Sequence, residues 1–270
     1  MPLTDEQRAA LAKKVGDIQT MFASNRRFAY DQAAELRKTS RYKKSQGVCF
    51  AMSIDWLRRR LWNVYNAGAK AKRNFDAAKY TQNEKQRVAL TEKHGRLQDA
   101  YQKNVAEVRL APVQSILARF VQAGVVSSGM DRLVATKLDD IHGYQLDEAV
   151  WAKTKDGLVP MGAPNTHFAF KQKLQAMLDR VRGLLTPAAP ALGLLVSMQG
   201  DGGHAIAFFF TMGQDVFFDP NFGEFEFAAP AQRARELTFV TDLWFDVYHR
   251  YYNMDALEFT LIAYQAPATG

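Results

Sequence analysis

Apolar residues recur at helical spacing through the first part of the chain. Thr4-Asp5-Glu6-Gln7 has the spacing of a capping box, which predicts a helix running to about Met21. A second helix is expected over Phe28–Lys38, and apolar positions from Val48 to about Asn66 indicate a third. Residues 67–110 are rich in Ala, Lys, Gln and Glu and contain no Pro, which favours one or two exposed helices.

The strand pattern dominates the last third of the chain. A clear amphipathic helix is expected over Lys171–Leu185, and the Pro-containing segment 186–190 ends it. Three apolar, β-rich runs then follow closely, over Leu192–Met198, His204–Thr211 and Asp215–Phe218. Helices first and an antiparallel meander second predict an α+β domain.

The remaining segments are assigned by weaker signals. Residues 123–155 fit either short strands or helix with loops, and both interpretations stay open. The other expected elements are a short helix at Val113–Gln122, an edge strand at Glu224–Phe227, a helix from Pro230 to about Tyr252 and a last strand at Leu257–Tyr264.

Composition and charge narrow the class of protein. The chain has 270 residues, of which 47% are hydrophobic, enough for one sizeable core. No apolar run reaches membrane-spanning length, and the N-terminus lacks the pattern of a secretory signal peptide. Residues 1–110 contain 23 Lys and Arg against 11 Asp and Glu, whereas residues 111–270 contain 12 against 17. The basic front half is therefore a candidate contact for an anionic membrane surface, although solvated basic helices are the simpler interpretation.

Other kinds of chemistry lack their usual sequence signals. The single cysteine excludes a cluster of thiolate ligands, and no two histidines have the spacing of a metalloprotease helix. There is no phosphate-binding loop or dinucleotide fingerprint, and no nucleic-acid-binding motif accompanies the basic residues. We therefore expect no metal, no cofactor and no specific nucleic-acid partner.

The only cysteine, Cys49, stands where a helix is expected to begin. Gly47 marks a turn just before it. A thiol at a helix N-terminus is stabilised as thiolate by the helix dipole and by the unpaired N–H groups there. A single cysteine is also among the most frequently buried and inert residues, so its position alone leaves both interpretations open.

The apolar hairpin around residues 204–219 carries an imidazole at one end and a carboxylate at the other. A two- or four-residue loop near Met212–Gln214 makes directly opposed residues differ by an odd number, and His204 and Asp219 differ by 15. The two side chains should therefore lie on one face, opposite or diagonal, within cross-strand reach. A carboxylate there can orient the imidazole and leave its other nitrogen for a thiol.

Three blocks of sequence resemble the YopT/AvrPphB-type cysteine proteases, a family of bacterial effectors with a papain-like fold. The first is Gly47-Val48-Cys49, with Trp56 beyond it. The second is Gly203-His204-Ala205, and the third and most specific is Phe218-Asp219-Pro220-Asn221-Phe222-Gly223-Glu224-Phe225. The resemblance covers roughly residues 45–264, and the stretch between Cys49 and His204 is longer than the family leads us to expect.

The resemblance implies a role for each matching residue. Cys49 would be the nucleophile, His204 the general base and then the acid, and Asp219 the residue that orients His204. The Cys49 backbone N–H would be one oxyanion donor, with Gln46 as a weaker candidate for the second because it is only three residues upstream. The implied domains are a helical N-terminal extension at residues 1–44 and a papain-like catalytic domain at 45–266. A helical insertion is expected at about 67–110.

The implied function is that of a cysteine endopeptidase, an effector or toxin secreted without a classical signal peptide and delivered into the cytoplasm of a target cell. Its substrate would be a protein there, with small GTPases and kinases as candidates, and a cognate immunity protein or chaperone is a further candidate partner. A transglutaminase or a glutamine deamidase on the same triad remains an alternative, as does a non-enzymatic binding protein that kept the fold.

Overall fold

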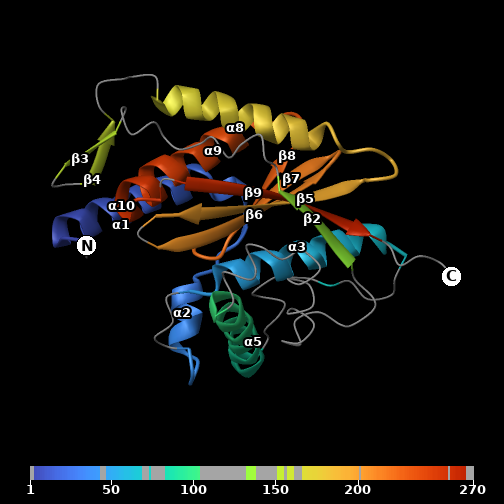
Figure 1. Ribbon diagram of the computed structural model, residues 1–270, viewed down its shortest axis with the longest axis horizontal. Helices are drawn as coiled ribbons and strands as arrows, with labels where there is room; N and C mark the ends of the chain where they lie inside the picture. Colours follow the sequence, from blue (N-terminus) through green and yellow to red (C-terminus); the bar gives the residue numbers. More distant parts are fainter. Residues whose placement is uncertain are drawn as a thin grey trace.

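The computed structural model places helices and strands around one antiparallel sheet (Figure 1). It describes residues 3–42, 47–68, 73, 83–103, 132–137, 151–154, 157–160, 166–200, 202–254 and 256–265. The helices are α1 (Asp5–Met21), η1 (Ala23–Asn25), α2 (Gln32–Arg37), α3 (Cys49–Tyr65), α5 (Glu84–Lys103), α8 (Thr166–Arg182), α9 (Arg233–Leu243), η4 (Trp244–His249) and α10 (Arg250–Tyr252).

Seven of the strands form the sheet in the order β1-β8-β7-β6-β5-β9-β2, and every neighbouring pair is antiparallel. They are β1 (Arg26–Phe28), β2 (Arg132–Lys137), β5 (Ala191–Gln199), β6 (Gly203–Thr211), β7 (Gln214–Asp219), β8 (Gly223–Ala228) and β9 (Ala256–Gln265). A separate hairpin joins β3 (Trp151–Thr154) and β4 (Gly157–Pro160). The predicted α+β class, with a helical front part and an antiparallel sheet behind it, is confirmed.

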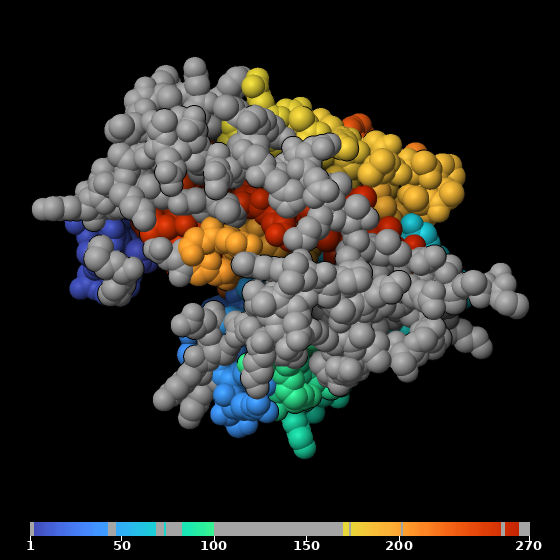
Figure 2. All heavy atoms as spheres, in the orientation of Figure 1, coloured from blue at the N-terminus to red at the C-terminus, as the bar shows by residue number. Residues whose placement is uncertain are grey.

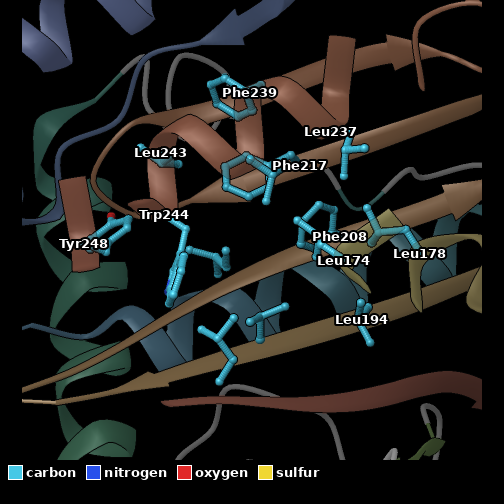
Figure 3. Close-up of a cluster of buried hydrophobic side chains, with 14 of the residues drawn as sticks. Leu174, Leu178, Leu194, Phe208, Phe217, Leu237, Phe239, Leu243, Trp244 and Tyr248 are labelled. Carbon is cyan, nitrogen blue, oxygen red and sulfur yellow. The ribbon is translucent and has the colours of Figure 1, made fainter. Parts of the chain in front are cut away.

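Each face of the sheet is covered by its own apolar cluster because the central strands are buried on both sides. Ile206, Phe208 and Phe210 of β6 belong to the cluster formed with α1, α8, α9 and η4. Figure 3 shows Phe208 within it, near Leu174 of α8. Ala207 and Phe209 of the same strand face α3 and α5. This alternation follows the predicted pattern, and Figure 1 shows α8 and α3 on opposite sides of the sheet.

The first hundred residues pack more closely than a set of exposed helices would. Ile18 and Phe22 enter the cluster beside α9, and Leu97 of α5 enters the cluster beside α3. Figure 2 shows α2 and α5 next to each other, and Arg87 of α5 pairs with Glu35 of α2 at 3.2 Å. The described part of the 67–110 stretch is therefore a packed helix.

Several boundaries differ from the expected ones for local reasons. Residues 26–28 pair with β8 as an edge strand, so α2 begins only at Gln32 rather than at Phe28. No sequence pattern indicates this strand, since Arg26-Arg27-Phe28 lacks an apolar alternation. The expected helix at Val113–Gln122 lies outside the described residues, and residues 132–137 and 151–154 of the ambiguous middle are strands.

The division into an N-terminal extension and a catalytic domain stays a prediction. Strand β1, which belongs to the extension as defined, nevertheless pairs within the sheet. Among the described segments, none of the helices combines the length and the apolar character needed to cross a bilayer.

Gly223 is the residue that lets β8 pass close to the chain leading out of β1. Its φ is +103°, and a Cβ built there would lie 2.1 Å from the carbonyl oxygen of Phe28. Both the dihedral and the space require glycine, because neither the backbone of β1 nor that of β8 can move independently of the sheet.

We predict that Gly223→Ala lowers the free energy of unfolding by roughly 2 kcal/mol or more, because strain and a backbone clash act together. Chemical denaturation would measure it. Gly16→Ala is the matched control, since nothing lies within 4 Å of the added Cβ in helix α1. The control should be neutral or slightly stabilising, and an equal effect of both substitutions would contradict the steric explanation.

Candidate active site

Cys49 is the first residue of α3, as its position after a turn predicted. Gly47 precedes it with φ +148°, and the Cys49 side chain is 7% exposed. The sulfur lies 4.0 Å from the carbonyl oxygen of Gly203, the residue before His204. The Cys49 N–H has no acceptor within the helix because it belongs to the first turn, so it remains a candidate oxyanion donor.

His204 and Asp219 meet at the end of the β6–β7 hairpin. The loop is two residues long, and Phe208 stands opposite Phe217. Continuing this register places Asp219 diagonal to His204, within the reach that the sequence spacing predicted. His204 Nε2 lies 3.0 Å from Asp219 Oδ1, and both side chains are buried.

Cys49 approaches the same imidazole from the other face of the sheet. Nε2 of His204 faces Asp219, so Nδ1 is the ring nitrogen left for the Cys49 side chain, whose sulfur lies beside the preceding residue, Gly203. Burial by itself lowers the pKa of His204, but the charges of Asp219 and Cys49 and their hydrogen bonds outweigh it and raise the pKa to about 10. The ring is therefore an imidazolium at neutral pH.

Two polar side chains anchor the start of α3 to the strands that carry His204 and Asp219. Ser53 donates a hydrogen bond of 3.0 Å to the carbonyl oxygen of Ala205. The Oε1 atom of Gln32 accepts from the backbone N–H of Val48 at 2.8 Å, while its Nε2 donates to Asn221 at 2.7 Å. Gln32 thus joins the residue before Cys49 to the residue two beyond Asp219.

The third sequence block also positions α3 from the side. Phe218 stacks on Trp56 with the ring centroids 5.2 Å apart, and both residues are fully buried. Trp56 Nε1 donates to Glu224 at 2.7 Å, and Arg60 forms an ion pair with the same carboxylate. The block therefore contributes packing and charge pairing to the nucleophile helix, as well as Asp219.

Two further polar side chains enclose the His204–Asp219 pair. The Tyr248 hydroxyl donates to Asp219 Oδ2 at 2.7 Å and lies 2.9 Å from His204 Nε2. Asn221 donates from its side chain to the Tyr248 oxygen at 3.1 Å and from its backbone to Asp219 Oδ1 at 2.7 Å. The sequence analysis gave neither residue a role: Asn221 was only a member of the third block, and Tyr248 only a position within an expected helix.

The sequence analysis named one weaker oxyanion candidate, Gln46, and missed one residue of the site, Gln32. Gln46 lies outside the described residues, so its part in the oxyanion hole stays a prediction. Gln32 was missed because it lies 17 positions before Cys49, and no local pattern links the two. Within the described part of the chain, no three His, Cys, Asp or Glu side chains gather as a metal site would need.

A thiol at a helix start, next to a buried imidazole that bonds a carboxylate, is the arrangement of cysteine hydrolases and related acyl transferases. The sequence model of the family described as Yersinia/Haemophilus virulence surface antigen, a family of cysteine peptidases, matches residues 18–267. The chain belongs to this family and is a cysteine protease, so its substrate is a protein.

One solved structure gives a further comparison. The structure of the Pseudomonas avirulence protein AvrPphB is 17% identical in sequence and has a TM-score of 0.39. The match covers 87% of this chain and 100% of that one. The search of curated protein sequences finds no match. The family named by the three sequence blocks is therefore the one that the family model identifies.

Folding should shift the pKa values of the two buried histidines, His204 and His249, in opposite directions. Nitrogen-15 NMR of the imidazoles should show His204 doubly protonated at neutral pH and losing its proton near about pH 10. His249, whose pKa burial lowers to about 4, should be neutral in the same spectrum and serve as the internal control.

The raised pKa of His204 also makes the stability of the fold depend on pH. Because folding raises the pKa of His204 from 6.5, its contribution to stability is complete below pH 6.5 and is lost as the pH rises through about 10. A neutral His204 ring at pH 7 would contradict the raised pKa.

Proposed function

We propose that this cysteine protease is an endopeptidase that works through Cys49, His204 and Asp219. The observation that carries the proposal is the buried hydrogen bond between His204 and Asp219, with the Cys49 sulfur 4.0 Å from the carbonyl oxygen of Gly203, the residue before that imidazole. The three residues come from three elements, α3, β6 and β7, and from both faces of the sheet, which packing alone does not require.

The chemistry follows from the charges. The Cys49 thiolate attacks the carbonyl carbon of the scissile peptide bond, and the oxygen becomes an oxyanion beside the Cys49 N–H. The His204 imidazolium gives its Nδ1 proton to the departing amine, which leaves a thioester on Cys49. His204 then accepts a proton from water as the water attacks the thioester, and the acid product and free thiolate result. Asp219 holds the Nε2–H tautomer throughout.

Other acyl transfers would use the same three residues. A transglutaminase or a glutamine deamidase differs only in the group that leaves and the nucleophile that attacks, so the geometry of the triad is common to all. Membership in a peptidase family favours peptide cleavage. The intact series of thiol, imidazole and carboxylate argues against a binding protein that has lost catalysis.

The setting we propose is that of an effector or toxin delivered into a target cell, where it cleaves a host protein. The virulence description of the family supports this setting. Small GTPases and kinases remain the candidate substrates.

Contact with an anionic membrane through residues 1–110 stays a separate prediction. Some of the charges there are already used within the fold, since Arg87 and Lys38 pair with Glu35 at 3.2 and 3.1 Å.

Cys49→Ala should abolish cleavage while leaving the fold intact, because the change removes one sulfur atom at a helix start. Mapping new protein N-termini in target cells that express the wild type or the variant would test this. The proposal expects a small set of new N-termini that depends on Cys49. Identical sets in both cells would contradict a cysteine-dependent endopeptidase.

His204→Ala and Asp219→Asn should differ in severity. The first removes the acid and base and should reduce kcat about as far as Cys49→Ala does, because the triad acts as a unit. The second keeps the shape and loses only the carboxylate charge, so residual cleavage should exceed that of His204→Ala. Kinetics on a peptide spanning a mapped cleavage site would measure both, and full activity of Asp219→Asn would remove Asp219 from the mechanism.

A further inference from the structure

The acid of the proposed triad is enclosed by donors from three segments. Asp219 is 0% exposed. Its Oδ1 atom accepts from His204 and from the Asn221 backbone, and its Oδ2 atom accepts from the Tyr248 hydroxyl. A buried carboxylate is costly unless its oxygens are satisfied. The Oδ2 donor, Tyr248, comes from a helix on the far side of the sheet from α3.

Both the proton and the oxygen of the Tyr248 hydroxyl take part in hydrogen bonds at this position. It donates its one proton to Asp219, while its oxygen faces two nitrogens, Nδ2 of Asn221 at 3.1 Å and Nε2 of His204 at 2.9 Å. Burial first, and then the charge of Asp219, raise the pKa of Tyr248 well above its usual range. The hydroxyl therefore remains a donor across the working pH range.

The ring of Tyr248 fixes the imidazole as well as the carboxylate. It stacks on His204 with the centroids 4.6 Å apart and the planes 25° apart. Tyr248 itself is 2% exposed and lies at one end of the apolar cluster that includes Trp244 (Figure 3). Both the plane of the imidazole and the direction of its Nε2–H are thus constrained by one side chain.

The helix around Tyr248 departs from regular α geometry. Residues Trp244–His249 form a π-helical turn between α9 and α10. Such turns insert one residue and rotate the side chains that follow, and they are frequent at functional sites. This turn ends next to the His204–Asp219 pair, and its fifth residue is the one that reaches it.

We propose that Tyr248 is a positioning residue of the active site, which holds His204 and Asp219 in the one arrangement that presents Nδ1 to Cys49. This inference rests on the proposed triad. Asn221 and Gln32 extend the same arrangement to the nucleophile, because Asn221 bonds Tyr248 and Gln32, and Gln32 bonds the backbone of Val48. Tyr248 touches neither the sulfur nor the scissile bond and acts through His204.

Tyr248→Phe is the sharpest test because it removes one oxygen and keeps the ring. The probe is iodoacetamide, which reports the thiolate at Cys49, at about pH 6 where an unassisted thiol reacts slowly. We expect alkylation and cleavage of a mapped peptide to slow about tenfold or more, the range known for outer hydrogen-bond partners of metal-bound histidines. KM should change little, because Tyr248 orients the catalytic groups rather than the substrate.

A spectroscopic readout separates this role from simple stabilisation. In the wild type the His204 Nε2–H should give a sharp, downfield imidazole proton resonance, and in Tyr248→Phe it should broaden or shift. Tyr251→Phe is the matched control, since Tyr251 lies on α10, where its ring is in contact with Arg250. The control should keep wild-type alkylation, cleavage and spectrum.

The outcomes distinguish the two levels of the proposal. Slow alkylation of the wild type itself would refute the triad. Fast alkylation of both wild type and Tyr248→Phe, with an unchanged Nε2–H resonance, would refute the role of Tyr248 alone. If Tyr248→Phe does not fold, Asn221→Ala takes its place, because it removes a donor to the Tyr248 oxygen. It should give a smaller loss of the same kind, and wild-type behaviour of that variant would overturn the inference.

Discussion

His204 and Asp219 are hydrogen-bonded at the open end of the β6–β7 hairpin, where β6 begins and β7 ends. The register of β6 and β7 fixes the diagonal relation of the two residues, and a two-residue loop fixes the register. The Asp219 carboxylate is fully buried, so losing any one of its hydrogen-bond donors would cost free energy. That cost holds in place each element that supplies a donor. The imidazolium that results gives Cys49 a charged partner.

The site depends on both faces of the sheet at once. The Asp219 carboxylate and Tyr248 belong to the face that carries α9 and η4, whereas Cys49 arrives with α3 on the other face. The two sides meet at the start of β6, where Cys49 lies close to Gly203. Packing on one face, such as Trp56 against Phe218, therefore sets the distance between groups that come from opposite faces.

Much of this arrangement could be predicted from local patterns. The alternation in β6, the capping box of α1 and the hairpin spacing depend on neighbouring residues, and the structure agrees with each. Residues 26–28 could not be predicted as a strand, because their pairing with β8 comes from tertiary packing and their own sequence is basic. Gln32 and Tyr248 were missed for a similar reason, since each acts on residues at least 16 positions away. The family blocks point to the proposed triad, but the polar side chains around it leave no pattern at short range in the sequence.

The most direct measurement of the central claim is the rate of Cys49 alkylation by iodoacetamide as a function of pH, in the wild type and in His204→Ala. The proposed action of His204 on Cys49 predicts that, near neutral pH, the wild type is alkylated much faster than His204→Ala. In His204→Ala the rate should be slow at low pH and rise toward alkaline pH as an ordinary thiol ionises. Identical, slow and steeply pH-dependent rates in both proteins would contradict the account.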